Sequence, residues 1–293
     1  MHKSGFVNII GNPNVGKSTL MNALVGERLS IINAKAQTTR HRIMGIVSGE
    51  DFQIVYSDTP GILKPAYKLQ ESMMRFVTGA LTDADVILYV TDTVEQTDRA
   101  AEILGNIRHS RIPTIVVINK VDLSNPAALD ALVEKWHETL PEARIVPVSA
   151  REQFNIEGLF RTILELLPEG PAFYPKDTLT DKTLRFFASE IIREKILRFY
   201  DKEIPYCCEI AIDAYKEEPT IDRIAATIYV ARDSQKGILI GHKGEKLKRV
   251  GQTAREDLEQ FLGKKVFLQL FVKVSDDWRN NERQLKRFGY DPE

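Results

Sequence analysis

A phosphate-binding loop near the start of the chain constrains the fold more than any other feature. Residues 11–18, Gly-Asn-Pro-Asn-Val-Gly-Lys-Ser, match the pattern G-x-x-x-x-G-K-[S/T]. Residues 5–10 before the loop are short and apolar, as in a buried strand, and residues 18–24 have the pattern of a helix start. A strand, a glycine-rich turn and a helix in this order predict an α/β fold that binds a nucleoside triphosphate.

Each part of this loop has an expected role. Its backbone N–H groups cradle the phosphates, Lys17 neutralises the outer phosphates, and Ser18 offers a hydroxyl to Mg²⁺. The alternative is a glycine-rich turn that merely caps a helix, and the motifs that follow argue against it. The residues of this region that we expect at the nucleotide are Gly11, Asn12, Pro13, Asn14, Val15, Gly16, Lys17, Ser18 and Thr19.

A second motif predicts which base is bound. Residues 119–122, Asn-Lys-Val-Asp, follow the strand-like run 113–118, and ligands of open α/β sheets bind at the carboxyl ends of strands. The Asp122 carboxylate can accept two hydrogen bonds from guanine that adenine cannot offer, and such a site rejects the wrong analogue by about 10⁴- to 10⁵-fold. The expected base-binding residues are Asn119, Lys120, Val121 and Asp122, together with Ser149 and Ala150, whose backbone can reach the guanine oxygen.

The segment between these motifs supplies the expected magnesium and γ-phosphate contacts. Residues 58–62, Asp-Thr-Pro-Gly-Ile, close another strand-like run. Asp58 can hold Mg²⁺ through water, and the Gly61 N–H can meet the γ-phosphate. Residues 37–40 contain two threonines, either of which can complete the Mg²⁺ shell. We therefore expect Asp58, Thr59, Pro60, Gly61 and Ile62 at the nucleotide, and Ser18, Asp58 and either Thr38 or Thr39 at the metal.

Ile62 raises a question about hydrolysis. Many regulatory GTPases place a water-orienting glutamine directly after the Asp-x-x-Gly glycine, and isoleucine cannot bond to water. Hydrolysis must then be slow or be completed by a partner, a cation or backbone groups. Asn14 is a candidate ligand for K⁺ near the phosphates, and the alternative is that it only stabilises the loop. The residues expected to support hydrolysis are Lys17, Asn14, Thr39 and Gly61.

The chain is long enough for a second domain. Of 293 residues, the first 168 hold the nucleotide motifs, with strand-like runs alternating with helical segments such as 97–108 and 156–167. This alternation predicts a mostly parallel sheet with helices on both faces. Residues 168–175 contain three prolines and a glycine, so we predict a linker at 169–182 and a further domain at 183–293 with a C-terminal helical tail.

The composition also indicates where in the cell the protein is located. No apolar run approaches the roughly 18 to 20 residues that cross a bilayer, and the phosphate loop comes too early to leave room for a signal peptide. We therefore expect a cytoplasmic protein. The two cysteines, Cys207 and Cys208, are adjacent, which suits reduced packing residues better than a disulfide or a metal site.

The C-terminal third has the pattern of an α+β domain. Helical periodicity over 183–200 precedes alternating runs at 208–214 and 224–230, then a helix at 245–262 and a third alternating run at 266–272. Gly241-His242-Lys243-Gly244 lies between two helical segments. A Gly-x-x-Gly sequence alone is weak evidence, and it can simply join two helices. Here a cluster of cations surrounds it, as expected for the loop of a KH domain, which clamps single-stranded RNA.

The expected RNA-binding residues combine this loop with its basic neighbours. They are Lys236, Gly237, Ile240, Gly241, His242, Lys243, Gly244, Lys246, Lys248 and Arg249. The positive charge is local, because the chain as a whole carries a formal net charge of −1. Such a balance favours a short single strand bound in a groove over non-specific duplex binding, and no DNA partner is expected.

The ordered motifs of residues 11–150 resemble the translation-factor class of GTPases. With the loop at 241–244 and the endings 272–278 and 288–290, the whole chain resembles the Era family of bacterial GTPases. The resemblance implies a GTPase that binds GTP and GDP, uses Mg²⁺, and binds 16S ribosomal RNA near its 3′ end. It also implies a role in ribosomal RNA processing and assembly of the small (30S) ribosomal subunit. Members of this family are also reported at the inner face of the cell membrane.

Two alternatives from other classes remain open at the level of sequence. One is an RNA-binding protein in which a guanine nucleotide is a folding ligand without turnover, which Ile62 keeps in consideration. The other is a membrane-peripheral signalling switch, although no strongly basic amphipathic helix or lipidation motif is found. Turnover of GTP measured with and without the small subunit or its RNA separates these alternatives.

Overall fold

The structure is a computed structural model that describes residues 2–94 and 100–290. The chain forms two compact units. The first contains residues 1–66 and 70–181, and the second contains residues 67–69 and 182–293. Each unit is described by itself below.

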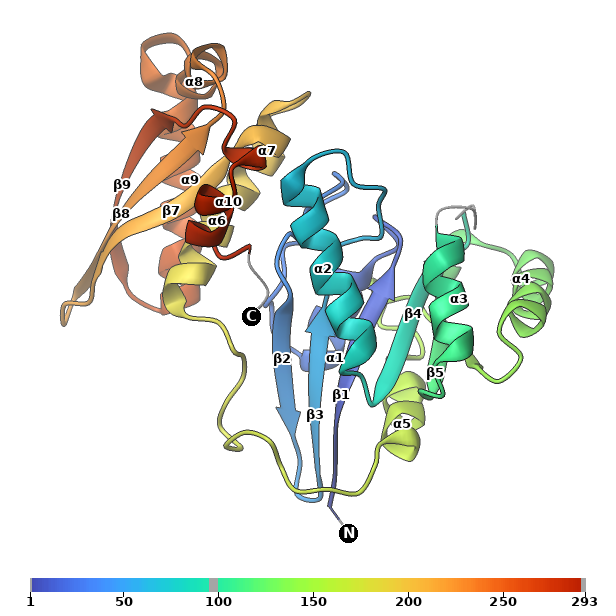
Figure 1. Ribbon diagram of the computed structural model, residues 1–293. Helices are drawn as coiled ribbons and strands as arrows, with labels where there is room; N and C mark the ends of the chain where they lie inside the picture. The colour runs from blue at the N-terminus through green and yellow to red at the C-terminus, as the bar shows by residue number, and fades with distance from the viewer. Residues whose placement is uncertain (1, 95–99, 291–293) are drawn as a thin grey trace. The chain divides into compact units, whose positions relative to one another are not determined.

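The first unit is built around a six-stranded sheet with strand order β2-β3-β1-β4-β5-β6 (Figure 1). Neighbouring strands are parallel except for β2, which is antiparallel to β3. The strands are β1 (Lys3–Gly11), β2 (Ile43–Ser48), β3 (Phe52–Asp58), β4 (Val86–Asp92), β5 (Thr114–Asn119) and β6 (Arg144–Pro147). The carboxyl ends of β1, β3, β4 and β5 meet at one edge of the sheet, where the nucleotide motifs follow them.

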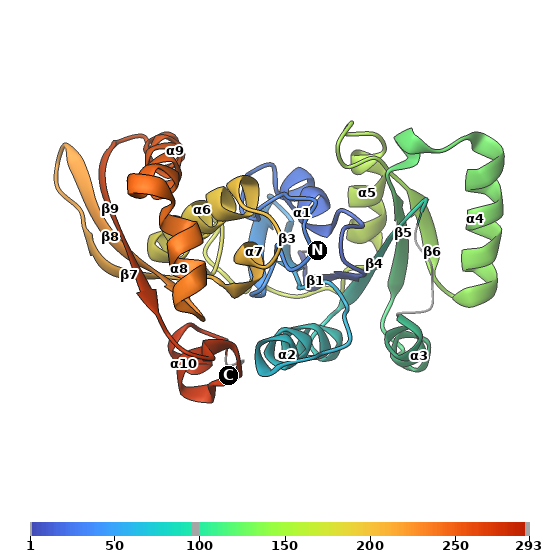
Figure 2. The same cartoon turned by 90° about the horizontal axis from the view of Figure 1, so that it is seen from above.

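Helices cover both faces of this sheet. Figure 2 shows α1 and α5 on one face and α2 and α3 on the other. The helices are α1 (Lys17–Val25), α2 (Lys68–Thr82), α3 (Ala101–His109), α4 (Pro126–Thr139) and α5 (Ile156–Leu166). This arrangement confirms the predicted α/β class. The helix expected at 97–108 corresponds to α3, and residues 97–99 of that prediction lie outside the described residues.

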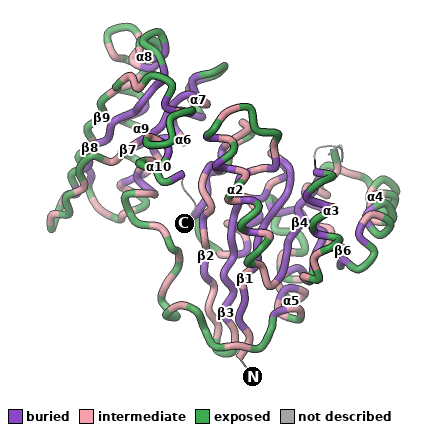
Figure 3. Tube along the Cα trace, in the orientation of Figure 1, coloured by how far each residue is buried: buried purple, intermediate pink, exposed green. Residues whose placement is uncertain are grey.

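The central strands are buried on both faces, as Figure 3 shows for β1, β3 and β4. All seven residues of β4 and all six of β5 are buried. Strands buried on both sides are mostly apolar, which is why residues 86–90 and 115–118 read as continuous apolar runs. On the face with α2 and α3, Tyr89 packs against Trp136 of α4 with ring centroids 5.4 Å apart.

The predicted linker region is held against the first unit by hydrogen bonds. Oε1 of Gln53 accepts the N–H groups of Phe173 and Tyr174 at 2.7 and 2.9 Å. Further along, the hydroxyl of Thr180 donates to the Met44 carbonyl oxygen at 2.6 Å. Residues 168–175 form no helix or strand, because proline lacks the N–H group that both structures need.

The second unit is a three-stranded sheet with order β7-β8-β9. Strand β8 is antiparallel to β7 and parallel to β9. The elements are α6 (Leu184–Phe199), α7 (Ile204–Cys207), β7 (Glu209–Lys216), β8 (Ile221–Val230), α8 (Asp233–Ile240), α9 (Glu245–Leu262) and β9 (Lys265–Val274). The predicted order of helix, two strands, two helices and a strand is confirmed, and the short helix α7 before β7 is an element that the sequence pattern did not predict.

The core of the second unit lies between this sheet and its helices. Ile192 and Ile196 of α6 and Val250 and Ala254 of α9 are buried in one cluster with residues of β8. Cys207 and Cys208 are free thiols buried in the same cluster, in agreement with a packing role.

The predicted C-terminal helical tail consists of the 3₁₀ turn η4 (Trp278–Asn280) and α10 (Glu282–Arg287). Trp278 donates its indole N–H to the Cys207 carbonyl oxygen at 2.9 Å. Within the described parts of the chain, none of the helices is long and apolar enough to cross a membrane.

Candidate functional site

The phosphate-binding loop connects the end of β1 to the start of α1. Gly16 precedes α1 with a φ of 95°, and a Cβ atom at this residue would lie 2.2 Å from Nδ2 of Asn119. Both the backbone conformation and the lack of space therefore require glycine at this position. Because α1 begins at Lys17, the free N–H groups of its first turn face the loop.

Lys17 holds its ammonium group inside this loop. Its Nζ atom donates to the carbonyl oxygens of Gly11 at 3.0 Å and Asn12 at 2.8 Å, and the side chain is buried. An ammonium group held by two carbonyl oxygens has a fixed place beside the cradle of N–H groups. The positive charge is thus positioned before any phosphate arrives.

Three oxygen-bearing side chains from separate elements meet beside Lys17. The Ser18 hydroxyl donates to Oδ2 of Asp58 at 2.7 Å and lies 2.9 Å from the Thr39 hydroxyl. The Thr39 hydroxyl also donates to the same carboxylate oxygen at 3.3 Å. Burial raises the pKa of Asp58 above its ordinary value, while the hydrogen bond from Ser18 and the charge of Lys17 act in the opposite direction.

This cluster fits a magnesium ion. Its members are two hydroxyls and a carboxylate, and hard oxygen ligands of this kind suit Mg²⁺. In addition, Oδ1 of Asp58 is fully buried and accepts no hydrogen bond from the described residues. A buried carboxylate oxygen without a partner is costly, and a cation or its bound water would remove that cost.

The structure separates the two candidate threonines. Thr39 points to Ser18 and Asp58, whereas the Thr38 hydroxyl donates to the Lys35 carbonyl oxygen at 2.6 Å. Thr38 therefore closes a turn within its own segment. The geometry favours Thr39 over Thr38 as the threonine that completes the metal shell.

The expected base-binding residues meet at the ends of β5 and β6. The Ser149 hydroxyl donates to Oδ1 of Asp122 at 2.6 Å, which fixes the direction of the carboxylate. Asp122 lies in the 3₁₀ turn η2 (Val121–Leu123) directly after β5. A carboxylate that is oriented before binding loses little conformational entropy when it accepts hydrogen bonds from a base.

Asn119 connects two loops of the site. Its Nδ2 atom donates to the Val15 carbonyl oxygen at 2.9 Å, and its Oδ1 atom accepts the Ala150 N–H at 3.0 Å. We expected the backbone at Ser149 and Ala150 to reach the guanine oxygen. In this structure the Ala150 N–H is donated to Asn119 and the Ser149 N–H to the Phe154 carbonyl oxygen.

Sequence reasoning missed Asp92 at the end of β4. Lys120 Nζ lies 2.6 Å from Oδ2 of Asp92 and donates to the Asn14 carbonyl oxygen at 2.6 Å. Asp92 therefore holds the lysine of the base motif onto the phosphate loop. The signal available in the sequence was an acidic residue at the end of a buried strand. In the structure, β4 and β5 pair in parallel and place Asp92 opposite Asn119.

One cavity of about 1120 Å³ joins the phosphate and base ends of the site. The expected residues that line it are Pro13, Asn14, Gly16, Lys17, Ser18, Thr19, Thr38, Thr39, Gly61, Asn119, Lys120, Asp122, Ser149 and Ala150. The sequence did not predict that residues 31–35 and Gln153 also line the cavity. Residues 31–35 form no helix or strand, so no periodicity pointed to them.

Eight of the residues that we expected at the nucleotide do not line the cavity. The structure places Gly11, Asn12, Val15, Asp58, Thr59, Pro60, Ile62 and Val121 outside its lining. Thr59, for example, donates its hydroxyl to the Ile9 carbonyl oxygen at 2.7 Å. Ile62 differs most from expectation, because its side chain packs in the core with Ile10 and Tyr89 and its N–H donates to the Gly11 carbonyl oxygen at 3.1 Å.

Asn14 lies at the mouth of the cavity. It is exposed and has a φ of 66°, a conformation that asparagine tolerates better than most residues. Its carbonyl oxygen accepts the hydrogen bond from Lys120. Both expectations for Asn14, as a cation ligand and as a loop-forming residue, are compatible with this position.

The second unit presents the predicted Gly-x-x-Gly loop between α8 and α9. Gly241 and Gly244 have φ values of 74° and 80°, and Lys243 between them also has a positive φ. A Cβ atom on Gly244 would contact nothing within 4 Å, so this glycine borders open space. Its conformation makes glycine favourable, and the loop leads directly into the N-terminus of α9, where N–H groups attract anions.

The expected cations surround this loop on the surface. His242, Lys243, Lys246, Lys248 and Arg249 are exposed, and Lys236 is half-buried. Arg249 stacks over the ring of Phe199 with 4.3 Å between its guanidinium carbon and the ring centroid. Gly237 is exposed and Ile240 is half-buried in α8. The loop thus combines backbone N–H groups, exposed positive charges and an apolar neighbour.

Comparison with known proteins agrees with both halves of the chain. Residues 6–120 match the family described as 50S ribosome-binding GTPase, and residues 203–279 match the KH domain family. The chain is 45% identical over 291 residues to GTPase Era of Staphylococcus haemolyticus, covering 99% of this chain and 97% of that protein. It is also 45% identical over 293 residues to GTPase Era of Alkaliphilus metalliredigens, covering 99% of each.

Two solved structures are similar over nearly the whole chain. One is a crystal structure of Era in complex with MgGDPNP and nucleotides 1506–1542 of 16S ribosomal RNA, with a TM-score of 0.96, 42% identity and complete coverage of both chains. The other is a crystal structure of a tyrosine-to-alanine variant of Aquifex aeolicus Era bound to GDP·AlF₄⁻, with a TM-score of 0.95 and 41% identity over 99% of this chain and 100% of that chain. From its nucleotide motifs, its KH unit and its full-length relatives, this chain belongs to the Era family of GTPases.

Proposed function

We propose that this GTPase binds Mg²⁺ with GTP, binds 16S ribosomal RNA near its 3′ end, and assists ribosomal RNA processing and small-subunit (30S) assembly. The observation that carries the first part is the single cavity that joins Asp122 and Ser149 at one end to Lys17, Ser18 and Thr39 at the other. Its volume of about 1120 Å³ is ample for a nucleotide.

The nucleotide is held by backbone and side chains of the first unit. The N–H groups of the phosphate loop receive the β- and γ-phosphates, and Lys17 neutralises their charge. Ser18 and Thr39 would hold Mg²⁺ directly, and Asp58 would hold it through water. A Mg²⁺ ion held by these residues would supply positive charge beside the phosphate oxygens. At the other end, Asp122 receives the N–H groups of guanine.

Hydrolysis depends on how the site positions the γ-phosphate and the attacking water. Thr39 and Gly61 both line the cavity. We assign them to the γ-phosphate, where the Thr39 hydroxyl and the Gly61 N–H would be available to the phosphate and the attacking water. Because Ile62 packs in the core, no side chain at that position orients the water. Asn14 is the residue that would hold a K⁺ ion near the phosphates, where such an ion would supply positive charge, and we expect slow intrinsic turnover without it.

Binding of RNA is supported by the loop at residues 241–244 and by the relative that was solved with nucleotides 1506–1542 of 16S ribosomal RNA. The glycines of the loop admit the phosphates, and Lys243, Lys246 and Lys248 neutralise them. The small ribosomal subunit is therefore the expected partner, with GTP and GDP as the small ligands.

The domain boundaries and the location remain part of this proposal. We assign residues 1–168 to the GTPase domain, 169–182 to the linker and 183–293 to the KH domain with its helical tail. A cytoplasmic location follows from the expected ribosomal partner. Peripheral association with the inner face of the membrane is proposed only from the resemblance to the family.

Calorimetric titration and turnover test the proposal together. The full chain should bind GTP and GDP but not ATP, and Lys17→Ala should abolish binding of GTP. Turnover of GTP should rise when small subunits or their 3′-terminal RNA are added. Equal affinity for GTP and ATP would overturn the guanine assignment. If GTP binds tightly but is not hydrolysed by the protein alone, with small subunits or with their RNA, the nucleotide is only a folding ligand.

A further inference from the structure

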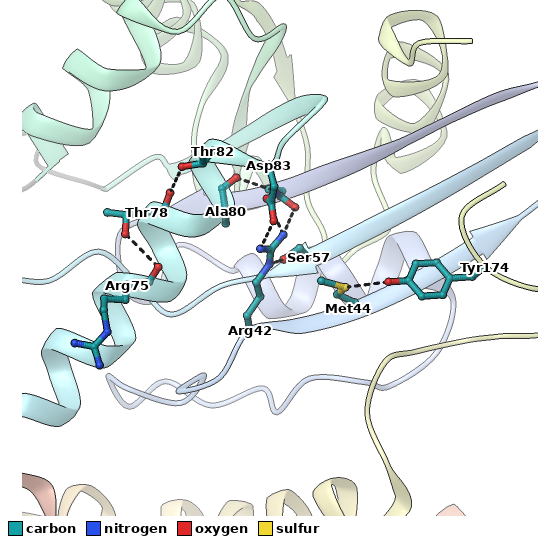
Figure 4. Close-up of polar contacts among 10 residues, drawn as sticks. Arg42, Met44, Ser57, Arg75, Thr78, Ala80, Thr82, Asp83 and Tyr174 are labelled. Carbon is teal, nitrogen blue, oxygen red and sulfur yellow. Dashed lines mark hydrogen bonds and ion pairs between the residues drawn. The ribbon is translucent and has the colours of Figure 1, made fainter. Parts of the chain in front are cut away.

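Arg42 connects the segment that contains Thr39 to β1, to β3 and to the residue that follows α2 in the first unit. Its Nε atom donates to the Ser57 hydroxyl at 2.6 Å, and its two terminal nitrogens donate to the two carboxylate oxygens of Asp83 at 2.6 and 2.9 Å. One of these nitrogens also donates to Oδ1 of Asn8 at 3.2 Å. Figure 4 shows the guanidinium group between Ser57 and Asp83.

The partners of Arg42 are themselves fixed. Asn8 of β1 and Ser57 of β3 are fully buried. Asn8 in turn donates to the Ala80 carbonyl oxygen at 2.6 Å and to Asp83 at 2.7 Å. The side chain of Arg42 is only 13% exposed, whereas that of Asp83 is 48% exposed. The pair is therefore a bidentate, partly buried contact, and this geometry requires the planar fork of arginine.

Three connections join Arg42 to the proposed metal-binding residues. Ser57, which accepts from Arg42, directly precedes Asp58, whose carboxylate accepts from Ser18 and Thr39. Ile43, which directly follows Arg42, pairs with Asp58 across β2 and β3. Thr39 precedes Arg42 by three residues, and three residues span at most about 10 Å. A displacement of Arg42 therefore passes to Thr39 over a short piece of chain.

We infer that Arg42 is a positioning residue for GTP hydrolysis. Its guanidinium group fixes the end of the Thr39 segment to β1, to β3 and to Asp83, which directly follows α2, and so keeps the Thr39 hydroxyl opposite Ser18 and Asp58. The inference rests on the proposed role of Thr39 at Mg²⁺ and the γ-phosphate. Arg42 itself touches neither Ser18 nor Thr39 through any described hydrogen bond, so its effect is indirect.

Single substitutions test this inference through the difference between GTP and GDP. Arg42→Gln removes the bidentate contact and should lower kcat for GTP about 10- to 100-fold, as expected for a displaced reacting group. Affinity for GDP should be unchanged, because GDP lacks the γ-phosphate that Thr39 serves. Arg42→Lys keeps the charge but not the fork, and should give a smaller loss. Arg75→Gln is the matched control, because Arg75 is exposed on α2 and donates to Ser72 at 2.8 Å, away from this network.

A double substitution separates positioning from a general loss of stability. If Arg42 acts through Thr39, Arg42→Gln should lower kcat no further in a Thr39→Ala background, because both changes remove the same contribution. Losses that multiply in the double variant would overturn the inference. Equal losses of GTP and GDP affinity in Arg42→Gln and Arg42→Lys would also overturn it, since they would show a structural role alone.

The same set of variants distinguishes failure of the inference from failure of the proposed function. If Thr39→Ala lowers kcat and both Arg42 variants retain the parent value, only the role of Arg42 is refuted. If Thr39→Ala itself leaves kcat unchanged, the proposed role of Thr39 fails and the inference about Arg42 fails with it. Thermal unfolding of each variant identifies any that do not fold, and Arg42→Lys then replaces Arg42→Gln in the double variant.

Discussion

The N–H group of Ile46 in β2 donates to the carbonyl oxygen of Leu179 at 2.8 Å. On either side of this bond, the Thr180 hydroxyl donates to the Met44 carbonyl oxygen and the Asp181 carboxylate accepts the Met44 N–H at 3.0 Å. Residues 179–181 therefore lie along β2 like a short additional strand. Since α6 begins at Leu184, only residues 182 and 183 separate this docked segment from the first helix of the second unit.

We expect this docking to be measurable by hydrogen exchange. The amides of Met44 and Ile46 should exchange slowly in the parent protein. Changing Thr180→Val together with Asp181→Ala removes two side-chain hydrogen bonds. At about 1 kcal/mol each, every lost bond should speed exchange of these amides about fivefold. Asp177→Ala is the control, because Asp177 is exposed in a turn. Fast exchange of both amides in the parent would show that the segment is undocked in solution.

The base-binding carboxylate should control nucleotide choice. Asp122→Asn replaces an acceptor with a side chain that also donates, so affinity for GTP should fall and xanthosine triphosphate should become the preferred ligand. The loss for GTP should approach the 10⁴- to 10⁵-fold discrimination of sites that pair every polar group. Ser149→Ala should also lower the affinity for GTP, but less strongly, because Ser149 only orients Asp122 through its 2.6 Å hydrogen bond. Calorimetry with the three triphosphates of guanosine, xanthosine and adenosine measures both effects, and retained GTP preference in Asp122→Asn would contradict the assignment.

A potassium effect on turnover should depend on Asn14. GTP hydrolysis should be slow in sodium and faster in potassium at equal ionic strength, since a cation near the phosphates stabilises the developing charge. Asn14→Ala should remove the increase without removing GTP binding, because the Asn14 carbonyl oxygen that meets Lys120 is part of the backbone. Turnover that is identical in the two salts would assign Asn14 to loop formation and the missing group to a partner.

Substitution in the RNA loop should separate RNA binding from nucleotide binding. Gly244→Asp places a negative side chain in open space at the loop and should abolish binding of single-stranded RNA, with GTP affinity intact. Lys243→Ala should act more mildly and flatten the log–log salt dependence by about 0.7, the value for one phosphate contact.

The matched control for Gly244→Asp is Gly263→Asp. Gly263 follows the other end of α9 with a φ of 63° and also borders open space, so the backbone strain is similar while the RNA loop is untouched. RNA titration and thermal unfolding are measured for both variants. Unchanged RNA binding by Gly244→Asp would refute the assignment of this loop.

Acid should destabilise the second unit through Asp222. The hydrogen bond from Lys264 holds the pKa of Asp222 below its ordinary value of 3.8, against the effect of burial, and the two groups lie 2.6 Å apart. A group with a lowered pKa stabilises the fold above its ordinary pKa, and this contribution is lost as the pH falls through the lowered value. The urea midpoint should therefore fall below about pH 4, and Asp222→Asn should show a weaker dependence in that range. An equally steep fall in Asp222→Asn would assign the acid sensitivity to other carboxyl groups.

Much of this protein could be predicted because its signals are local. The phosphate loop is defined by consecutive residues between β1 and α1, and α9 was predicted over the same residues, 245–262, that the structure shows. In β9, exposed and more buried residues alternate along the strand, which is the period that predicted it. Local geometry and the burial of one face determine such patterns, so the sequence displays them directly.

The placement of single side chains needed the tertiary structure. Thr38 and Thr39 are chemically alike and adjacent, and only the position of Asp58 on β3 distinguishes them. Ile62 was expected at the nucleotide but packs in the core, because its backbone N–H rather than its side chain meets the phosphate loop. The contact of Asp92 with Lys120 also needed the tertiary structure, because the two residues are 28 positions apart in the sequence.

The sequence by itself thus determined the α/β class, the nucleotide motifs, the second unit and the order of its elements. The tertiary structure decided which of two threonines contacts Ser18 and Asp58, how Arg42 is anchored, and that residues 179–181 dock on β2. The physical reason is distance along the chain. Backbone conformation and periodic burial depend on near neighbours, whereas a hydrogen bond between Arg42 and Asp83 or between Leu179 and Ile46 exists only once the sheet has brought distant segments together.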